Sequence, residues 1–189
     1  MAVKTLTPAS LYMNYKGASY IPLNIVGLPK EIDVLGKHWS RKDEFHSSIV
    51  YIKRIAVDVG KALGVQESDA ENKLWEATEK CYDPKEQFTI TPTGELRTAR
   101  FDREGVTEET IVVMVTVNGI KPFFERLEKA LGVGIEIPPT HITAYIIPSG
   151  GIGVPIPDGQ ALQERTELLA GAELSTVKKA MKFDQVFGA

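Results

Sequence analysis

Two kinds of hydrophobic pattern run through this chain. Short apolar or β-branched runs predict strands at residues 19–28, 45–52, 110–117 and 141–147. Apolar residues at helical spacing predict helices at residues 53–63, 68–81, 121–131, 161–170 and 174–187. The pattern therefore indicates a mixed α+β fold. Residues 1–17 show no clear period and are expected to be partly extended.

Residues at the ends of the predicted helices act as start and stop signals. Gly64 and Gly132 each follow the last apolar position of a helix, where a left-handed residue commonly ends it. Ser68 and Glu71 have the spacing of a capping box, which predicts the start of the second helix. Pro122 suits the first turn of the third helix.

The connecting segments are less regular. The polar segment 30–44 is expected to be a loop with a short strand or turn. Two β-like runs, 87–91 and 95–102, flank Pro92-Thr93-Gly94 and predict a hairpin. Residues 148–159 are rich in glycine and proline and predict a loop. Because no low-complexity linker divides the chain, residues 1–189 are interpreted as one domain.

Composition limits the classes of function. The 189 residues are 43% hydrophobic and 25% charged, with a formal net charge of −3, which argues against a general basic surface for long nucleic acid. Cys81 is the only cysteine, so neither an internal disulfide nor a cysteine-rich zinc site is expected. Neither a signal peptide nor a run long enough to cross a membrane is evident. These features predict a cytoplasmic protein.

Two similar tripeptides carry the candidate chemistry. His46-Ser47-Ser48 and His141-Ile142-Thr143 each begin or lie within a predicted strand. Since side chains i and i+2 share one face of a strand, each tripeptide presents an imidazole beside a hydroxyl. One histidine could accept a proton from water while the other donates one, and the hydroxyls could hold a phosphate. This combination predicts metal-free hydrolysis of a phosphodiester, with His46, Ser48, His141 and Thr143 as catalytic candidates.

The third histidine of the chain matches the same short pattern. His38-Trp39-Ser40 is an alternative first motif, but the charged residues Arg41-Lys42-Asp43-Glu44 follow it, which does not fit a buried strand. His46 is therefore preferred. The three histidines are too scattered, and lack an acidic residue at a ligand spacing, to predict a metal site.

With these two motifs, roughly half a chain length apart, residues 19–157 resemble the two-histidine (2H) phosphoesterase superfamily of LigT-like, 2′-5′ RNA ligase-like cyclic phosphodiesterases. The resemblance implies a bilobal, pseudo-twofold LigT-like fold with two antiparallel-rich sheets around a central cleft and helices outside. It also implies that a small nucleotide, a cyclic oligonucleotide or an RNA end is the substrate, and that no cofactor is needed. The Ser at position 47 departs from the apolar residue common in the family; its side chain is expected to point away from the cleft.

Two aromatic residues are candidates for substrate binding. Tyr145 alternates with His141 and Thr143, so it is expected to face the same cleft, either contacting the substrate or covering the cleft floor. Trp39 lies in the predicted polar loop and could stack on a base. Two other readings of the whole chain stay open: a non-catalytic nucleotide- or RNA-binding module of the same fold, and a structural protein whose histidines are incidental.

Overall fold

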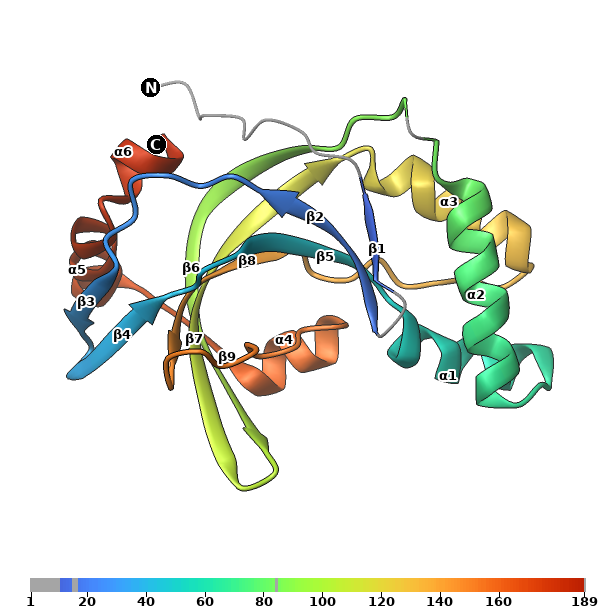
Figure 1. The fold of residues 1–189 in the computed structure, drawn as a ribbon, viewed down its shortest axis with the longest axis horizontal. Coiled ribbons are helices and arrows are strands. Elements are labelled where there is room, and N and C mark those ends of the chain that lie inside the picture. Colours follow the sequence, from blue (N-terminus) through green and yellow to red (C-terminus); the bar gives the residue numbers. More distant parts are fainter. Residues whose placement is uncertain (1–10, 15–16, 84, 189) are drawn as a thin grey trace.

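The computed structural model describes residues 11–14, 17–83 and 85–188. These residues form an α+β fold with two antiparallel sheets, in the strand orders β1-β2-β5 and β3-β4-β8-β7-β6-β9 (Figure 1). The strands are β1 Tyr12–Asn14, β2 Ala18–Leu23, β3 Glu31–Val34, β4 Lys37–Arg41, β5 Phe45–Tyr51, β6 Thr89–Arg103, β7 Val106–Asn118, β8 His141–Ile147 and β9 Thr166–Leu168. The helices are α1 Ile52–Leu63, α2 Glu67–Cys81, α3 Ile120–Leu131, α4 Gly159–Arg165, α5 Gly171–Met181 and α6 Phe183–Phe187.

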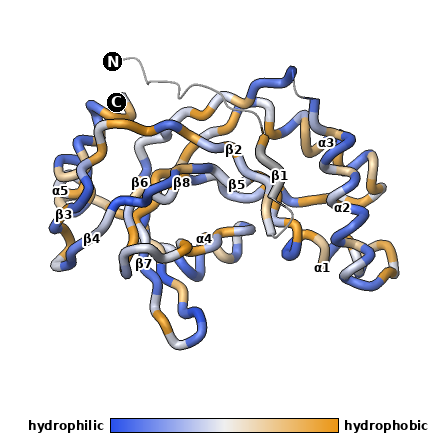
Figure 2. The backbone as a smooth tube through the Cα atoms, viewed as in Figure 1, coloured by the Kyte–Doolittle hydropathy of each residue, from blue (hydrophilic) through white to orange (hydrophobic). Residues whose placement is uncertain are grey.

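The helices gather at opposite ends of the sheets. Helices α1, α2 and α3 lie at one end, α5 and α6 lie near β3 at the other, and α4 lies between them (Figure 1). Hydrophilic residues dominate the projecting end of the β6–β7 hairpin (Figure 2). The apolar side chains of α1 and α3 face inward because they recur every three or four positions.

The six-stranded sheet is covered on both faces. Alternate residues of β7 belong to different hydrophobic clusters. Ile111, Val113 and Val115 are part of the main core, which contains residues from both sheets and from five of the helices. Val112 and Met114 belong to a smaller cluster on the opposite face, under the segment that contains Val154 and Ile156. Since β7 is buried on both faces, its nearly continuous β-branched sequence is explained.

Several predicted boundaries are confirmed. Helices α1 and α3 end where the glycines predict, with Gly64 and Gly132 in the left-handed conformation and their N–H groups bonded to Gly60 and Glu128. The predicted strand at 45–52 and the strand at 110–117 correspond to β5 and to the larger part of β7. The predicted extended segment at 1–17 lies largely outside the described residues.

Other predictions are wrong. The expected hairpin around Pro92-Thr93-Gly94 is instead one continuous strand, β6, with a register shift between Pro92 and Leu96; its hairpin partner is β7. A bulge accommodates Pro92-Thr93-Gly94 without ending the strand, because β7 supplies hydrogen bonds to β6 on both sides of the bulge. Helix α2 begins after Gln66, and no side chain caps it, so Ser68 is not its cap.

Two further segments differ from expectation because of strand pairing. The polar segment 30–44 forms the β3–β4 hairpin, where exposed polar residues alternate with buried Ile32, Val34 and Trp39. The predicted helix at 161–170 ends at Arg165, and the next three residues form β9, which pairs with the edge of β6. Within the described part of the chain, no helix has both the length and the apolar character required to cross a bilayer.

Candidate active site

The first motif lies on β5, an edge strand of the three-stranded sheet. His46 pairs with Pro22 and Ser48 pairs with Tyr20, so both motif side chains share the face that carries Tyr20. The Tyr20 and His46 rings are tilted against each other, with centroids 4.7 Å apart. Ser47 is fully buried on the opposite face, as expected, and its hydroxyl has no hydrogen-bond partner.

The second motif lies at the start of β8. His141 pairs with Met114 and Thr143 pairs with Val112, so both motif side chains lie on the sheet face that carries the smaller apolar cluster. The Nδ1 atom of His141 is 3.3 Å from the Pro139 carbonyl. A carbonyl can only accept, so Nδ1 carries the hydrogen and Nε2 is the acceptor nitrogen of the neutral ring.

The chain path brings the two motifs together. Strand β4 pairs with the second half of β8, and Lys42, just beyond β4, donates its backbone N–H to Ala144 at 3.0 Å. Strand β5 continues past the first half of β8, and the two strands are in contact (Figure 1). The charge of His46 contributes to the lowering of the His141 pKa.

The surroundings of the two rings set different pKa values. Burial lowers the pKa of His141 to about 4; the Pro139 carbonyl opposes this shift and the charge of His46 adds to it. Burial also lowers the pKa of half-buried His46, as does the nearby charge of Lys42, while Glu44 acts in the opposite direction. Burial therefore favours the neutral form of both rings.

The hydroxyl groups have distinct neighbours. Thr143 lies against Gly153 in the segment that follows β8: a Cβ atom on Gly153 would be 3.6 Å from the Thr143 hydroxyl. Ser48 lies near Tyr51. Burial raises the pKa of Tyr51 to about 12, and hydrogen bonding to Ser48 and to the backbone of Ile156 lowers it in part.

Tyr51 is a site residue that the sequence pattern missed. Strict alternation along β5 places it on the face opposite His46 and Ser48. The chain turns into α1 immediately after Tyr51, so alternation no longer holds there. One feature of the sequence could have indicated this: the junction between strand and helix predicted at residues 52–53, where side chains no longer alternate between two faces.

Tyr145 does not face the site, contrary to prediction. Ile111 pairs with Tyr145 and Val112 pairs with Thr143, so Ala144 is the extra residue of a β-bulge. The bulge turns Tyr145 to the main core, where it is fully buried and donates its hydroxyl to the Pro29 carbonyl at 3.1 Å. It can neither contact a substrate nor form the cleft floor.

Trp39 is also not available for base stacking. It is 1% exposed, and its indole nitrogen donates to the Val34 carbonyl at 3.0 Å. The prediction is wrong because the segment around Trp39 is a β-hairpin that buries alternate residues. His38, the rejected alternative, is an exposed hairpin residue paired with Asp33 at 2.8 Å.

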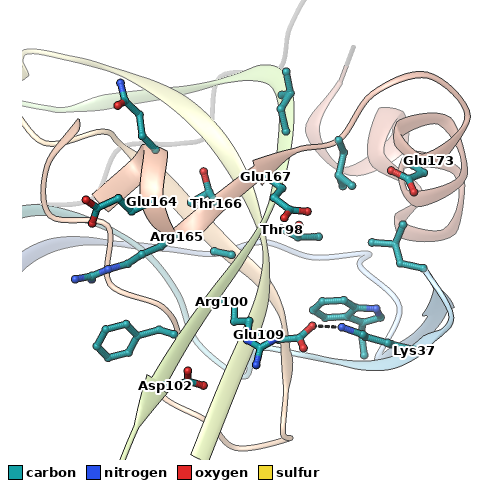
Figure 3. A pocket seen from close by; sticks show the side chains of 17 residues that line it. Lys37, Thr98, Arg100, Asp102, Glu109, Glu164, Arg165, Thr166, Glu167 and Glu173 are labelled. Carbon is teal, nitrogen blue, oxygen red and sulfur yellow. Dashed lines mark hydrogen bonds and ion pairs between the residues drawn. The ribbon is translucent and has the colours of Figure 1, made fainter. Parts of the chain in front are cut away.

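Two hollows in the surface differ in their position relative to the motif histidines, and one of the two is lined by His46. A groove of about 610 Å³ runs from His46 and Tyr20 past Pro22 to Val26 and Arg41, and its size suits a small ligand. A larger cavity of about 820 Å³ lies on the β6–β9 side of the large sheet and includes neither motif histidine (Figure 3). Its charged lining residues are mainly acidic: Asp102, Glu109, Glu164, Glu167 and Glu173 against Lys37, Arg100 and Arg165. This cavity is thus poorly suited to a phosphate.

No protein-family model, curated protein or solved structure matches this chain. Among the described residues, no group of three or more His, Cys, Asp or Glu side chains is placed to hold a metal ion. The geometry of the two motifs is therefore the feature of this molecule that points to a function.

Proposed function

We propose that this protein is a phosphodiesterase that hydrolyses a cyclic phosphate, or a 2′-5′ or cyclic linkage of a small nucleotide, by two-histidine acid–base catalysis without a metal. One observation carries the proposal. Two His-x-Ser/Thr motifs from distant parts of the chain lie on contacting strands, and the charge of one histidine reaches the other. A bilobal LigT-like arrangement, with the cleft between β5 and β8, belongs to the same proposal.

The surroundings of His141 suit the general base. Its Nδ1–H is directed to the Pro139 carbonyl, and burial keeps the ring neutral, so Nε2 can accept a proton from water. The water oxygen then forms a bond to phosphorus. The imidazole of His141 becomes positively charged as the proton arrives.

His46 would serve as the general acid. It is only half buried, beside the groove that has room for the remainder of the substrate. A bound phosphate raises the pKa of a neighbouring histidine and favours its protonated form. His46 then gives its proton to the leaving oxygen as the phosphorus–oxygen bond breaks. The Ser48 and Thr143 hydroxyls would donate hydrogen bonds to the non-bridging oxygens, where negative charge increases in the transition state.

The test is product formation from a panel of 2′,3′-cyclic nucleotides and 2′-5′ dinucleotides after treatment with EDTA. We expect multiple turnovers by the wild-type protein and a loss of about 10²–10⁴-fold in both His46→Ala and His141→Ala. His38→Ala is the matched control, because His38 is in the same short pattern but outside the site, and it should retain full activity. Normal turnover in either motif variant would overturn the proposal. Ligand-induced stabilisation without any product would favour the binding-module alternative instead.

A further inference from the structure

Lys42 is a cation on the same side of the large sheet as the second motif. Ser40 pairs with Ile146, and Lys42 is two residues further along, on the same face. Its Nζ atom donates to the Gly151 carbonyl at 2.8 Å and lies 3.4 Å from the Ile152 carbonyl. The Lys42 side chain therefore connects the residues just before β5, which carries the first motif, to the segment that follows β8, which carries the second.

That segment is held from its other side by a carboxylate. Glu108 is buried and accepts hydrogen bonds from the backbone N–H groups of Ile152 at 3.3 Å and Gly153 at 3.0 Å. Gly153 in turn lies against the Thr143 hydroxyl. The Lys42 ammonium therefore bonds to the two residues that directly precede Gly153, the glycine that lies against the Thr143 hydroxyl.

Within the described part of the chain, the hydrogen-bond partners of the Lys42 ammonium are neutral carbonyls and include no carboxylate. Arg54 differs, because Asp58 and Asp158 both accept hydrogen bonds from it. An ammonium has three donors, and two carbonyls use at most two of them. The charge of Lys42 also contributes to the lowering of the His46 pKa.

We propose that Lys42 binds the substrate phosphate: the carbonyls of Gly151 and Ile152 hold its ammonium, and the remaining N–H donates to a non-bridging oxygen beside Thr143. This inference rests on the proposed function, since it assigns the phosphate to the same site. Binding by a single cation also favours a substrate that places one phosphate in the site. A long polyanion would instead need a row of basic side chains.

The test compares Lys42→Gln with Lys42→Arg. Glutamine removes the charge but keeps an N–H donor for the loop, and arginine keeps the charge. Lys61→Gln is the matched control, because Lys61 is exposed in the last turn of α1. Binding of adenosine 3′-monophosphate and inorganic phosphate is measured by calorimetry, and KM is measured with the best cyclic nucleotide. Melting temperatures establish that each variant is folded, and Lys42→Leu replaces the glutamine variant if that protein does not fold.

We expect the neutral Lys42 variant to bind both ligands about 10–100-fold more weakly and to raise KM similarly, as for loss of a charged hydrogen bond. Lys42→Arg and Lys61→Gln should stay close to wild type. Unchanged binding in the neutral variant, or an equal loss in Lys61→Gln, would overturn the inference even if turnover is normal. Lys42-dependent binding without turnover would support the inference while removing the proposed reaction. Absence of ligand binding in a wild-type protein that still turns over would overturn the inference alone, whereas absence of both binding and turnover would remove both proposals.

Discussion

His46 and His141 occupy the same place in nearly the same tripeptide, yet their surroundings differ. His46 is half buried beside an open groove, and a tyrosine ring and two charged residues influence it. His141 is buried, and its ring is oriented by a backbone carbonyl. A repeated motif therefore does not imply equivalent groups, because burial and neighbouring atoms give the two rings different pKa values.

The largest expected effect tests the roles that we propose for the two histidines, general acid for His46 and general base for His141. A 4-nitrophenyl phosphodiester has a leaving group that needs no proton, so removal of a general acid should matter little. We expect His46→Ala to recover most of its activity on this substrate, whereas His141→Ala should stay about 10²–10⁴-fold impaired. Steady-state rates on the nitrophenyl ester and on a cyclic nucleotide provide the measurement. Equal impairment of both variants on the activated ester would contradict the distinction.

A second prediction uses the buried environment of His141. Its pKa in the folded state is about 4, below the ordinary 6.5, so the unfolded chain binds more protons between these pH values. The free energy of unfolding should therefore fall as the pH falls from about 6.5 to 4, and His141 alone should contribute about 3 kcal/mol to that change. Urea unfolding at both pH values checks this. His141→Gln should show a smaller pH dependence; an identical dependence would be inconsistent with a buried neutral ring.

The third prediction concerns the segment after the second motif, which has no counterpart after the first. Gly153 has φ +111°, a conformation disfavoured for alanine, and lies against Thr143. Gly153→Ala should cost about 1–3 kcal/mol of stability and also lower kcat/KM. Gly105→Ala is the control: Gly105 has φ +81° at the hairpin tip and open space around it, so stability should fall without a change in kinetics. Normal kinetics in Gly153→Ala would show that this segment does not contribute to activity.

The smallest expected effects distinguish two tyrosines. Tyr145→Phe leaves the Pro29 carbonyl without its partner and should cost about 0.5–1.5 kcal/mol of stability, with kcat/KM unchanged. Tyr51→Phe removes a phenol beside Ser48, so it should lower kcat/KM instead. Thermal unfolding and steady-state kinetics of both variants provide the test. A kinetic defect in Tyr145→Phe would show that our description of the bulge is incomplete.

Local sequence signals predicted much of the framework. The helices that end at Gly64 and Gly132, and the strands that carry the two motifs, follow from hydrophobic periods and stop signals within a few residues. The β3–β4 hairpin, the continuous strand β6 and the short strand β9 were missed. Each depends on a hydrogen-bonding partner from another part of the chain, which a local window cannot include.

The candidate site likewise has features that local sequence predicted and features that depend on distant parts of the chain. Alternation correctly placed each histidine beside its hydroxyl, because i and i+2 share a face in any regular strand. Alternation failed at Tyr145, where one inserted residue reverses the face, and at Tyr51, where the strand becomes a helix. A bulge depends on the register with β7, so no property of the tripeptide itself could indicate it.

The amino-acid sequence was sufficient to indicate an α+β chain and to place each imidazole on the same strand face as a hydroxyl, because both follow from backbone periodicity. The folded chain was needed to establish that strands from opposite halves of the chain lie together, that one ring is buried and the other half exposed, and that Lys42 reaches the loop beside Thr143. These properties arise from strand register and packing between distant segments, which set the distances and the burial on which the chemistry depends.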